Sequence, residues 1–387
     1  MRPGIAVRPD NAGLYVHVPF CSAVCPYCDF AVSVARPGEH AAFLSAVSAE
    51  AHNYRDWPLP FDTVYFGGGT PSALSGTALQ ELLATLRAAL PIAPDARVFL
   101  EANPEDITPA YLGGVTGLGV HTLSLGVQSF DDRELRLLGR RHTGAQALEA
   151  VRRCLAAGIH TVSVDVIFGL PGQSRAELEV TLRAIEQLRP HHVSCYQLTI
   201  HEGTNFHRRE RSGRLTQLEE DRQAELYEYL TRRLAECGLQ PYEVSNFARA
   251  PQFQSLHNNK YWRHVPYLGL GPSAHSFDGS KRWWNLRNHR AYADALTEAR
   301  TPVDDCETLE AADLALETLM LGIRTAAGID LDAYRERFAV DLASVNAELL
   351  SELCALDYVE CTPASLAPTP RGMAVADALA AQLDTGL

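Results

Sequence analysis

The sequence predicts an α/β protein in which an incomplete (β/α)6 barrel of the TIM type is followed by a smaller, winged-helix-like α+β domain. Three observations support this fold class. Short β-branched or aromatic runs alternate with helical stretches over the first half of the chain, and these runs lie roughly 30–40 residues apart. The alternation then gives way to a different pattern in the last third of the chain. Regular βα alternation predicts a parallel sheet with crossover helices.

The predicted strands are short apolar segments bounded by Gly, Pro or polar residues, as in a buried parallel sheet. They cover residues 14–18, 63–66, 98–101, 122–127, 161–168 and 193–200. Helical periodicity occupies the intervals at 39–54, 76–90, 109–117, 131–138, 144–157 and 175–188. Because a closed TIM barrel needs eight such units, six units predict an incomplete barrel or an open twisted sheet.

We divide the chain into three predicted segments. Residues 1–240 contain the βα repeats, and residues 241–302 form a connecting region dense in His, Tyr and Trp without clear periodicity. Residues 303–387 contain three helical stretches, a β-pair within 358–368 and a last helix. Helices with a small β-wing predict the winged-helix-like domain.

Composition excludes several function classes. The 34 basic and 47 acidic residues give a net charge of −13, which disfavours duplex nucleic acid as a partner, because proteins bind its phosphates mainly through Lys and Arg. No apolar run approaches the ~18 residues of a membrane span, and residues 1–10 contain no apolar signal-peptide core. We therefore expect a cytoplasmic protein.

The chain has nine cysteines, and most of them are scattered. Cysteine is among the most buried residue types, so we expect core positions for the scattered ones. These are Cys154, Cys195, Cys237, Cys306, Cys354 and Cys361. A local basic cluster at 208–214 is expected to be a solvated loop, because acidic residues surround it.

The remaining three cysteines, Cys21, Cys25 and Cys28, form a Cys-x3-Cys-x2-Cys motif directly after the first predicted strand. Three thiolates from one loop can bind three irons of a [4Fe–4S] cluster and leave the fourth iron open for S-adenosylmethionine (SAM). A structural zinc site or three core cysteines are the alternatives, but zinc usually takes four ligands and no second CxxC pair follows. The spacing, with aromatic Tyr27 before Cys28, matches the radical SAM superfamily.

Polar and glycine-rich groups follow the next predicted strands, at the edge where ligands of parallel α/β folds collect. The second strand ends in the run 67–71, GGGTP, which lets backbone approach a ligand closely. The third ends at Glu101, the fourth at Gln128 with Arg140 nearby, and the fifth carries Asp165. Each alone is as compatible with a structural role, but their occurrence on consecutive strands predicts a cofactor pocket.

Several longer runs carry a family resemblance: LYVHVPFC, YFGGGTPS, LEANPED, SLGVQSF, LGRRH and DVIFGLPGQ. They resemble the oxygen-independent coproporphyrinogen III oxidase-like proteins, and the similarity covers nearly the whole chain. Within this radical SAM family the sequence is most similar to the heme chaperone branch, the HemW type. The dehydrogenase branch has a further cysteine where this chain has Phe30, and the chaperone branch has an HNxxYW motif, found here at residues 257–262.

The resemblance implies a set of ligand-binding residues. Those expected to contact SAM are Tyr15, Tyr27, Gly68, Gly69, Thr70, Glu101, Gln128, Arg140 and Asp165. His257 of the HNxxYW motif is expected to ligate heme iron, since neutral imidazole is a common axial donor. On its residues alone a structural role for His257 is the stronger interpretation, and His264 and His275 are alternative ligands.

Two functions stay open at this point. A heme chaperone would bind heme and deliver it to hemoproteins such as respiratory cytochromes, whereas a coproporphyrinogen III dehydrogenase would make protoporphyrinogen IX by radical oxidative decarboxylation. A radical SAM enzyme with an unrelated substrate is a third option. The resemblance favours the chaperone, with an electron donor if SAM is cleaved, and leaves a dimer and transient membrane association open.

Overall fold

The computed structural model describes residues 11–387; the expectation about a signal peptide concerns residues 1–10, which lie outside the described residues. A 12-stranded sheet dominates the fold, in the order β12-β11-β10-β9-β1-β2-β3-β4-β5-β6-β8-β7. Its central strands are β1 (Ala12–Val18), β2 (Phe61–Gly68), β3 (Ile92–Ala102), β4 (Val120–Gln128), β5 (Thr161–Phe168) and β6 (His192–Gln197). They are neighbours in chain order and parallel throughout, which confirms the predicted βα repeats.

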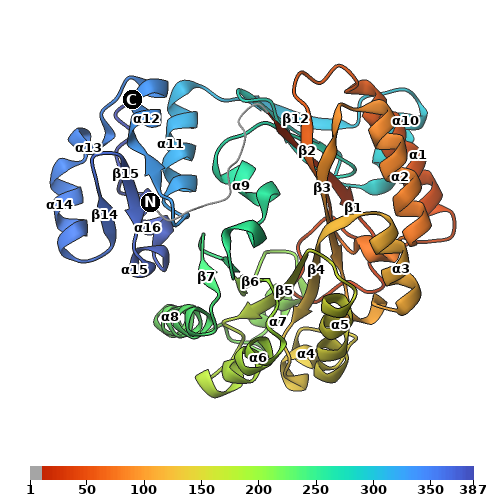
Figure 1. The fold of residues 1–387 in the computed structure, drawn as a ribbon, viewed down its shortest axis with the longest axis horizontal. Coiled ribbons are helices and arrows are strands. Elements are labelled where there is room, and N and C mark those ends of the chain that lie inside the picture. Colours follow the sequence, from red (N-terminus) through yellow and green to blue (C-terminus); the bar gives the residue numbers. More distant parts are fainter. Residues whose placement is uncertain (1–10) are drawn as a thin grey trace.

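The crossover helices cover the outer face of this sheet, while its inner face curves around a central helix, α9 (Figure 1). The outer helices are α1 (Glu39–Asn53), α2 (Gly76–Ala89), α3 (Pro109–Gly117), α4 (Asp132–Leu137), α5 (Gly144–Ala156) and α6 (Arg175–Leu188). Local sequence fixes where several of them begin. Thr143 with Gln146, and Ser174 with Glu177, form capping boxes that satisfy free backbone N–H groups at the starts of α5 and α6.

The connecting region and the first residues of the third segment contribute strands to the same sheet, which the sequence does not predict. Strand β9 (Tyr267–Leu270) pairs parallel to β1, and β10 (His275–Phe277), β11 (Lys281–Asn285) and β12 (Val303–Thr308) extend it in antiparallel fashion. At the other edge, β8 (Asn246–Ala248) and β7 (Gln240–Pro241) follow β6. The sheet is therefore open, with β12 and β7 as its edges.

The remaining helices of this half are α7 (Asn205–Arg211), α8 (Glu220–Glu236), α9 (Leu256–Trp262) and α10 (His289–Thr297). Helix α9 contains the HNxxYW motif and contacts β1 and β2. A buried ion pair of 2.7 Å between Lys260 Nζ and Asp62 Oδ1 anchors it to the start of β2. The motif therefore lies against the inner face of the sheet.

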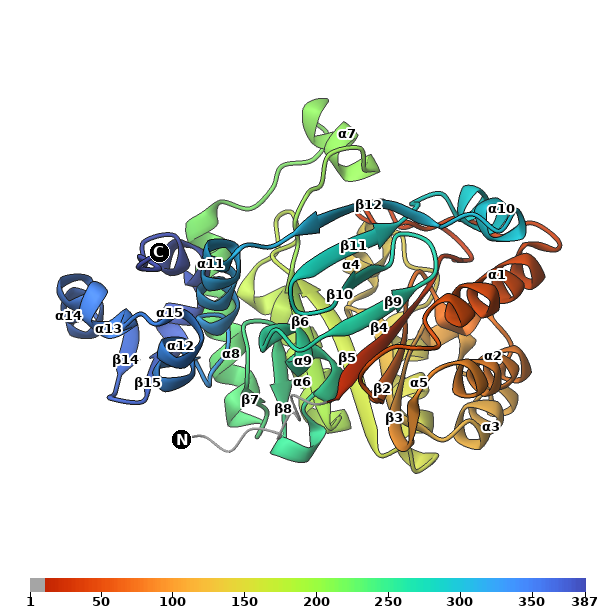
Figure 2. The same cartoon turned by 90° about the horizontal axis from the view of Figure 1, so that it is seen from above.

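The C-terminal module has its own core and lies at one side of the sheet, where β12 leads into α11 (Figure 2). Its helices are α11 (Ala311–Gly322), α12 (Leu331–Phe338), α13 (Leu342–Val345), α14 (Ala347–Ala355), α15 (Pro370–Met373) and α16 (Ala376–Ala380). A small antiparallel sheet joins β13 (Ile329–Asp330), β15 (Ser365–Pro368) and β14 (Val359–Cys361). Leu319, Tyr334 and Leu366 pack at the centre, as expected for helices with a β-wing.

Two local expectations are corrected. Core packing holds for Cys154 and Cys195, but Cys306, Cys354 and Cys361 are exposed. Cys306 lies on β12, an edge strand whose residues after Val303 are exposed and, apart from Cys306, charged or polar, so no second layer covers it. The basic cluster begins in a helix, α7, instead of a loop, although three of its four arginines are exposed as predicted. No helix in the described part of the chain is both long and apolar enough to cross a membrane.

Candidate cluster and cofactor site

The three clustered cysteines lie on the loop that follows β1, and backbone hydrogen bonds hold both ends of this loop. Cys21 N donates to Ser33 O (2.9 Å), which closes the loop on itself. Gly69 N donates to Val18 O (2.8 Å), which ties the loop's start to the end of β2. The loop therefore occupies the carboxyl ends of the strands, where the sequence predicts the site.

Polar side chains from the segments that follow β2 and α4 reach two of the thiols. Thr70 Oγ1 donates to Cys21 Sγ (3.3 Å), and Arg140 Nη1 donates to Cys25 Sγ (3.4 Å). Between them, Asn103 Nδ2 donates to Thr70 Oγ1 (3.2 Å), while its Oδ1 accepts from Arg140 Nη2. These residues form one polar network along the loop. Burial raises the pKa of Cys21, and the hydrogen bond from Thr70 opposes that shift by favouring thiolate, the form that binds iron.

The far side of the cysteine loop packs on α7. Phe206 N donates to Pro26 O (2.9 Å), and the rings of Tyr27 and Phe206 lie 6.2 Å apart. Burial raises the pKa of Tyr27, with the nearby Cys25 as a second cause. The Tyr27 side chain beside the cysteines is therefore uncharged at physiological pH.

These residues fit a [4Fe–4S] cluster. Within residues 11–387, no three His, Cys, Asp or Glu side chains converge on a single metal ion. A cubane requires no such convergence, because each thiolate binds a different iron. Arg140 Nε is buried without a hydrogen-bond partner among the described residues, so the guanidinium beside Cys25 has a donor left for an anionic ligand. A small cavity lined by Cys25, Asn103, Arg140 and Arg141 adjoins it.

Packing explains two of the three glycines that end β2. Gly68 has φ +108°, and a side chain there would collide with the ring of His17. A Cβ at Gly69 would lie 2.9 Å from the carbonyl oxygens of Val18 and Phe20. Gly67 faces the inner surface beside Tyr15 and Glu101, so its missing side chain leaves room at the site.

Glu101 and Asp165 are held on the inner face of the sheet, and no cationic side chain among residues 11–387 pairs with either of them. Tyr65 OH donates to Glu101 Oε1 (2.8 Å), and Gly68 N donates to its Oε2 (3.2 Å). Ser124 Oγ donates to Asp165 Oδ1 (2.8 Å). Burial, more than any charge, raises the pKa of Glu101 to about 7 and that of Asp165 to about 6. Both carboxyls can therefore exchange a proton near neutral pH.

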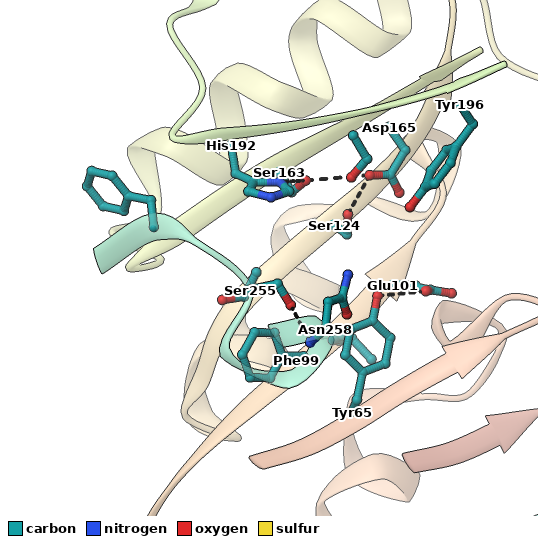
Figure 3. A pocket seen from close by; sticks show the side chains of 14 residues that line it. Tyr65, Phe99, Glu101, Ser124, Ser163, Asp165, His192, Tyr196, Ser255 and Asn258 are labelled. Atoms are coloured by element: carbon teal, nitrogen blue, oxygen red, sulfur yellow. Dashed lines mark hydrogen bonds between the residues drawn. The ribbon is translucent and has the colours of Figure 1, made fainter. Parts of the chain in front are cut away.

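The two carboxyls line a cavity between the sheet and α9, together with Tyr65, Tyr196 and Asn258 (Figure 3). Tyr15 lies next to it, with its OH 3.2 Å from His17 Nδ1. The structure thus brings Tyr15, Glu101 and Asp165 to one inner surface and places Tyr27, Thr70 and Arg140 at the cysteine loop. Gln128 ends β4 between these groups in a left-handed conformation, φ 69°.

His257 has no free ring nitrogen in this structure. Its Nδ1 is 2.8 Å from Thr63 Oγ1, its Nε2 is 2.8 Å from Tyr261 OH, and the side chain is 1% exposed. Burial lowers its pKa to about 3, so the imidazole is neutral. An iron bond to Nε2 would first require the bond to Tyr261 to open.

The sequence reasoning missed the serine residues that hold Asp165. Ser124, Ser163 and Ser194 stand on three consecutive strands and all hydrogen-bond to its carboxylate. A repeated pattern could have revealed them, because each serine is the fourth residue of a run that starts with His: HTLS, HTVS and HHVS.

Comparison with known proteins agrees with this architecture. The Radical SAM superfamily model matches residues 15–214, and the HemN C-terminal domain model matches residues 309–375. The solved structure of coproporphyrinogen III oxidase (HemN) from Escherichia coli superimposes with a TM-score of 0.82, covering 99% of this chain and 92% of that one. At 22% identity, this similarity shows the fold alone.

Curated relatives are similar over most of their length. "Heme chaperone HemW" of Mycobacterium tuberculosis is 39% identical over 352 residues, covering 88% of this chain and 90% of that protein. The HemW of Bacillus subtilis is 30% identical over 361 residues, covering 92% and 95%. A bovine "Radical S-adenosyl methionine domain-containing protein 1, mitochondrial" is 34% identical, covering 83% and 74%. The chain therefore belongs to the radical SAM superfamily, a family that implies a [4Fe–4S] cluster and SAM, and within it to the family of the HemW heme chaperones.

Proposed function

We propose that this protein is a heme chaperone, which binds heme and transfers it to acceptor hemoproteins, with respiratory cytochromes among the candidates. The observation that carries the proposal is the 39% identity, over 88% of the chain, with a relative named a heme chaperone. The dehydrogenase alternative would use the same cofactor site on a porphyrinogen substrate.

In this proposal Cys21, Cys25 and Cys28 hold the cluster, and Thr70 and Arg140 stabilise its thiolates through the hydrogen bonds described above. When bound, cluster and SAM together supply one-electron reduction of the SAM sulfonium, for which an external electron donor is needed. Arg140 would also orient the SAM carboxylate through its unpaired Nε.

The proposed SAM contacts divide by location. Gly68, Gly69 and Thr70 present backbone and hydroxyl groups at the cysteine loop. Glu101 and Asp165 line the inner cavity, and Tyr15 lies beside Glu101 and Tyr65. Tyr27 lies at the cysteine loop, and Gln128 Nε2 lies beside Gly126, close to Arg140. Because Glu101 and Asp165 have raised pKa values, they can accept hydrogen bonds from an ammonium or ribose group without holding a fixed double charge.

The experiment is an anaerobic heme titration of the cluster-loaded protein, run beside an assay for decarboxylation of coproporphyrinogen III. A heme chaperone binds heme stoichiometrically and tightly and releases no carbon dioxide from the porphyrinogen. Weak or absent heme binding contradicts the proposal. Decarboxylation that requires SAM would assign the chain to the dehydrogenase function instead.

A further inference from the structure

The cysteine loop, residues 19–38 between β1 and α1, exposes large apolar side chains to solvent. Val24, Phe30 and Val34 are 51%, 63% and 56% exposed. Phe30 is the most exposed large apolar side chain among residues 11–387. Iron binding by the cysteines does not require apolar groups in contact with water, so these side chains need a separate explanation. A group of exposed apolar residues commonly marks a surface that binds a partner.

Arginines border this loop on two sides. Arg141 lines a small cavity together with Ser22 and Ala23 of the loop. Arg287 Nη2 donates a hydrogen bond to the backbone oxygen of Asp29. Because both arginines are exposed, positive charge flanks the apolar part of the loop at the surface.

Helix α7 borders the loop on a third side, where Phe206 contacts Pro26 and Tyr27. This helix projects from the body of the fold (Figure 2). The helix and the turn that follows it carry four arginines: Arg208, Arg209, Arg211 and Arg214. The guanidinium carbon of Arg209 lies 5.4 Å from the centroid of the Phe206 ring, whereas the other three arginines are exposed.

The exposed arginines around the loop lack counter-charges. They are Arg141, Arg208, Arg211, Arg214 and Arg287. Within residues 11–387 none of them forms an ion pair. Of the acids nearby, Asp29 pairs with His201 (3.5 Å), while Glu202 and Glu210 are the other acids of the segment that contains α7. The chain as a whole has a net charge of −13, so this local positive charge differs in sign from the rest. An acidic partner would supply the missing counter-charges.

The position of this surface indicates which kind of partner it fits. Cys21, Cys25 and Cys28 lie in the same loop and are only partly buried. A cluster held there needs an external electron donor, and a donor docked on the loop would come close to it. Transient electron-transfer complexes have small interfaces, in which complementary charges steer the encounter. An anionic membrane would also satisfy the arginines, but it gives no reason for the surface to be centred on the cysteines.

We propose that the cysteine loop and α7 form the docking surface for a small, acidic electron-transfer protein. Phe30 and its apolar neighbours on the loop contact an apolar patch of the donor, and Arg208, Arg211 and Arg287 pair with its carboxylates. The inference rests on the cluster of the proposed function, because the donor supplies an electron to that cluster. It does not depend on heme.

The test uses the full, cluster-loaded chain with a flavodoxin as the acidic probe. Calorimetric titration with oxidised flavodoxin measures docking in the absence of electron transfer. Stopped-flow absorbance with reduced flavodoxin measures the delivery of electrons. In that reaction the flavin hydroquinone anion gives one electron to the oxidised cluster and becomes the neutral semiquinone.

Two variants test the two parts of the surface. Arg208→Glu combined with Arg211→Glu should slow reduction by flavodoxin at least about tenfold at low ionic strength, because repulsion replaces attraction. This difference should largely disappear at about 1 M salt, where the charges are screened. Phe30→Ala should weaken the binding of oxidised flavodoxin about tenfold, since it removes the most exposed apolar contact.

Matched controls exist for both changes. Arg87→Glu combined with Arg152→Glu changes the net charge equally, but at exposed positions on the outer helices α2 and α5. Leu356→Ala removes an apolar side chain that is 54% exposed on the C-terminal module. Both controls should bind flavodoxin and accept electrons like the wild type. All variants should keep the wild-type cluster absorbance, because none of them replaces a cluster cysteine.

A wild-type chain that does not bind flavodoxin would overturn the proposal, as would wild-type affinity and rate in the Phe30 and arginine variants. Equal losses in the charge-matched control would also overturn it. Binding to vesicles of phosphatidylserine and phosphatidylcholine that Phe30→Ala abolishes, without an effect on flavodoxin, would assign the surface to a membrane instead. Heme titration is independent of these measurements, so failure of this surface is distinguishable from failure of the proposed function.

Discussion

Lys260 is one of two lysines in the chain, and its side chain is completely buried. Its Nζ lies 2.7 Å from Asp62 Oδ1 and donates to Asn11 O (2.9 Å). These bonds connect α9 to the beginnings of β1 and β2. We therefore predict that Lys260→Met loosens α9 and destabilises the whole sheet.

The size of the effect follows from what the substitution leaves behind. Removing one partner of a buried ion pair typically costs 3–5 kcal/mol, because the other charge stays buried without compensation. Asp62 is 16% exposed and keeps a hydrogen bond from Asn11 Nδ2 (3.1 Å), which limits the penalty. We expect the free energy of unfolding to fall by about 3 kcal/mol, near the lower end of that range. The double variant Lys260→Met with Asp62→Leu should recover most of the loss.

Urea unfolding followed by far-UV circular dichroism measures this change as a shift of the transition midpoint. Lys281→Met is the control, because Lys281 is the other lysine and is exposed on β11. The control should stay within about 0.5 kcal/mol of the wild type. A Lys260→Met variant as stable as the control would refute the role assigned to the ion pair.

Three other predictions concern the site. Cys21→Ser should lose the absorbance of a full [4Fe–4S] cluster. Cys306→Ser, on the exposed edge strand, should keep it. An intact cluster spectrum in Cys21→Ser would contradict the assignment of Cys21 as a ligand. Thr63→Val should lower the free energy of unfolding by about 1–3 kcal/mol, since it removes the hydrogen-bond partner of buried His257 Nδ1, and an unchanged urea midpoint would contradict this. The folded-state pKa of Glu101, about 7, exceeds its ordinary value of 4.5, so the folded protein holds this proton more tightly. The contribution of Glu101 to stability therefore declines as pH rises from about 4.5 to about 7, and Glu101→Gln should reduce the pH dependence of unfolding over that window by at most about 3 kcal/mol. Identical pH profiles for variant and wild type would argue against a buried, titrating Glu101.

The local sequence pattern was sufficient to predict the βα repeats, because hydrophobic runs and capping residues such as Thr143 and Ser174 act within a few positions of the chain. It was insufficient for β9, a four-residue strand whose pairing with β1 spans about 250 residues. A strand this short has too few residues to show periodicity, and its place in the sheet is decided by tertiary contacts. The edge strand β12 illustrates the same limit, because only its position explains why Cys306 is exposed.

The cofactor site shows a similar division. The cysteine spacing predicts the loop, and the strand ends predict Glu101 and Asp165 on one surface, because parallel strands align their carboxyl ends. The sequence could not predict how individual side chains are oriented and which groups enclose them. His257 is enclosed by Thr63 and Tyr261, which no spacing rule anticipates.

Heme transfer is the most direct test of the central claim. The heme-loaded, cluster-containing protein is mixed with an apo-hemoprotein acceptor, and the Soret band of the acceptor is followed against an equal concentration of free heme with excess albumin as a trap. The account predicts stoichiometric transfer to the acceptor that outcompetes the trap. Transfer no faster than from free heme, with all heme captured by the trap, would contradict a chaperone function.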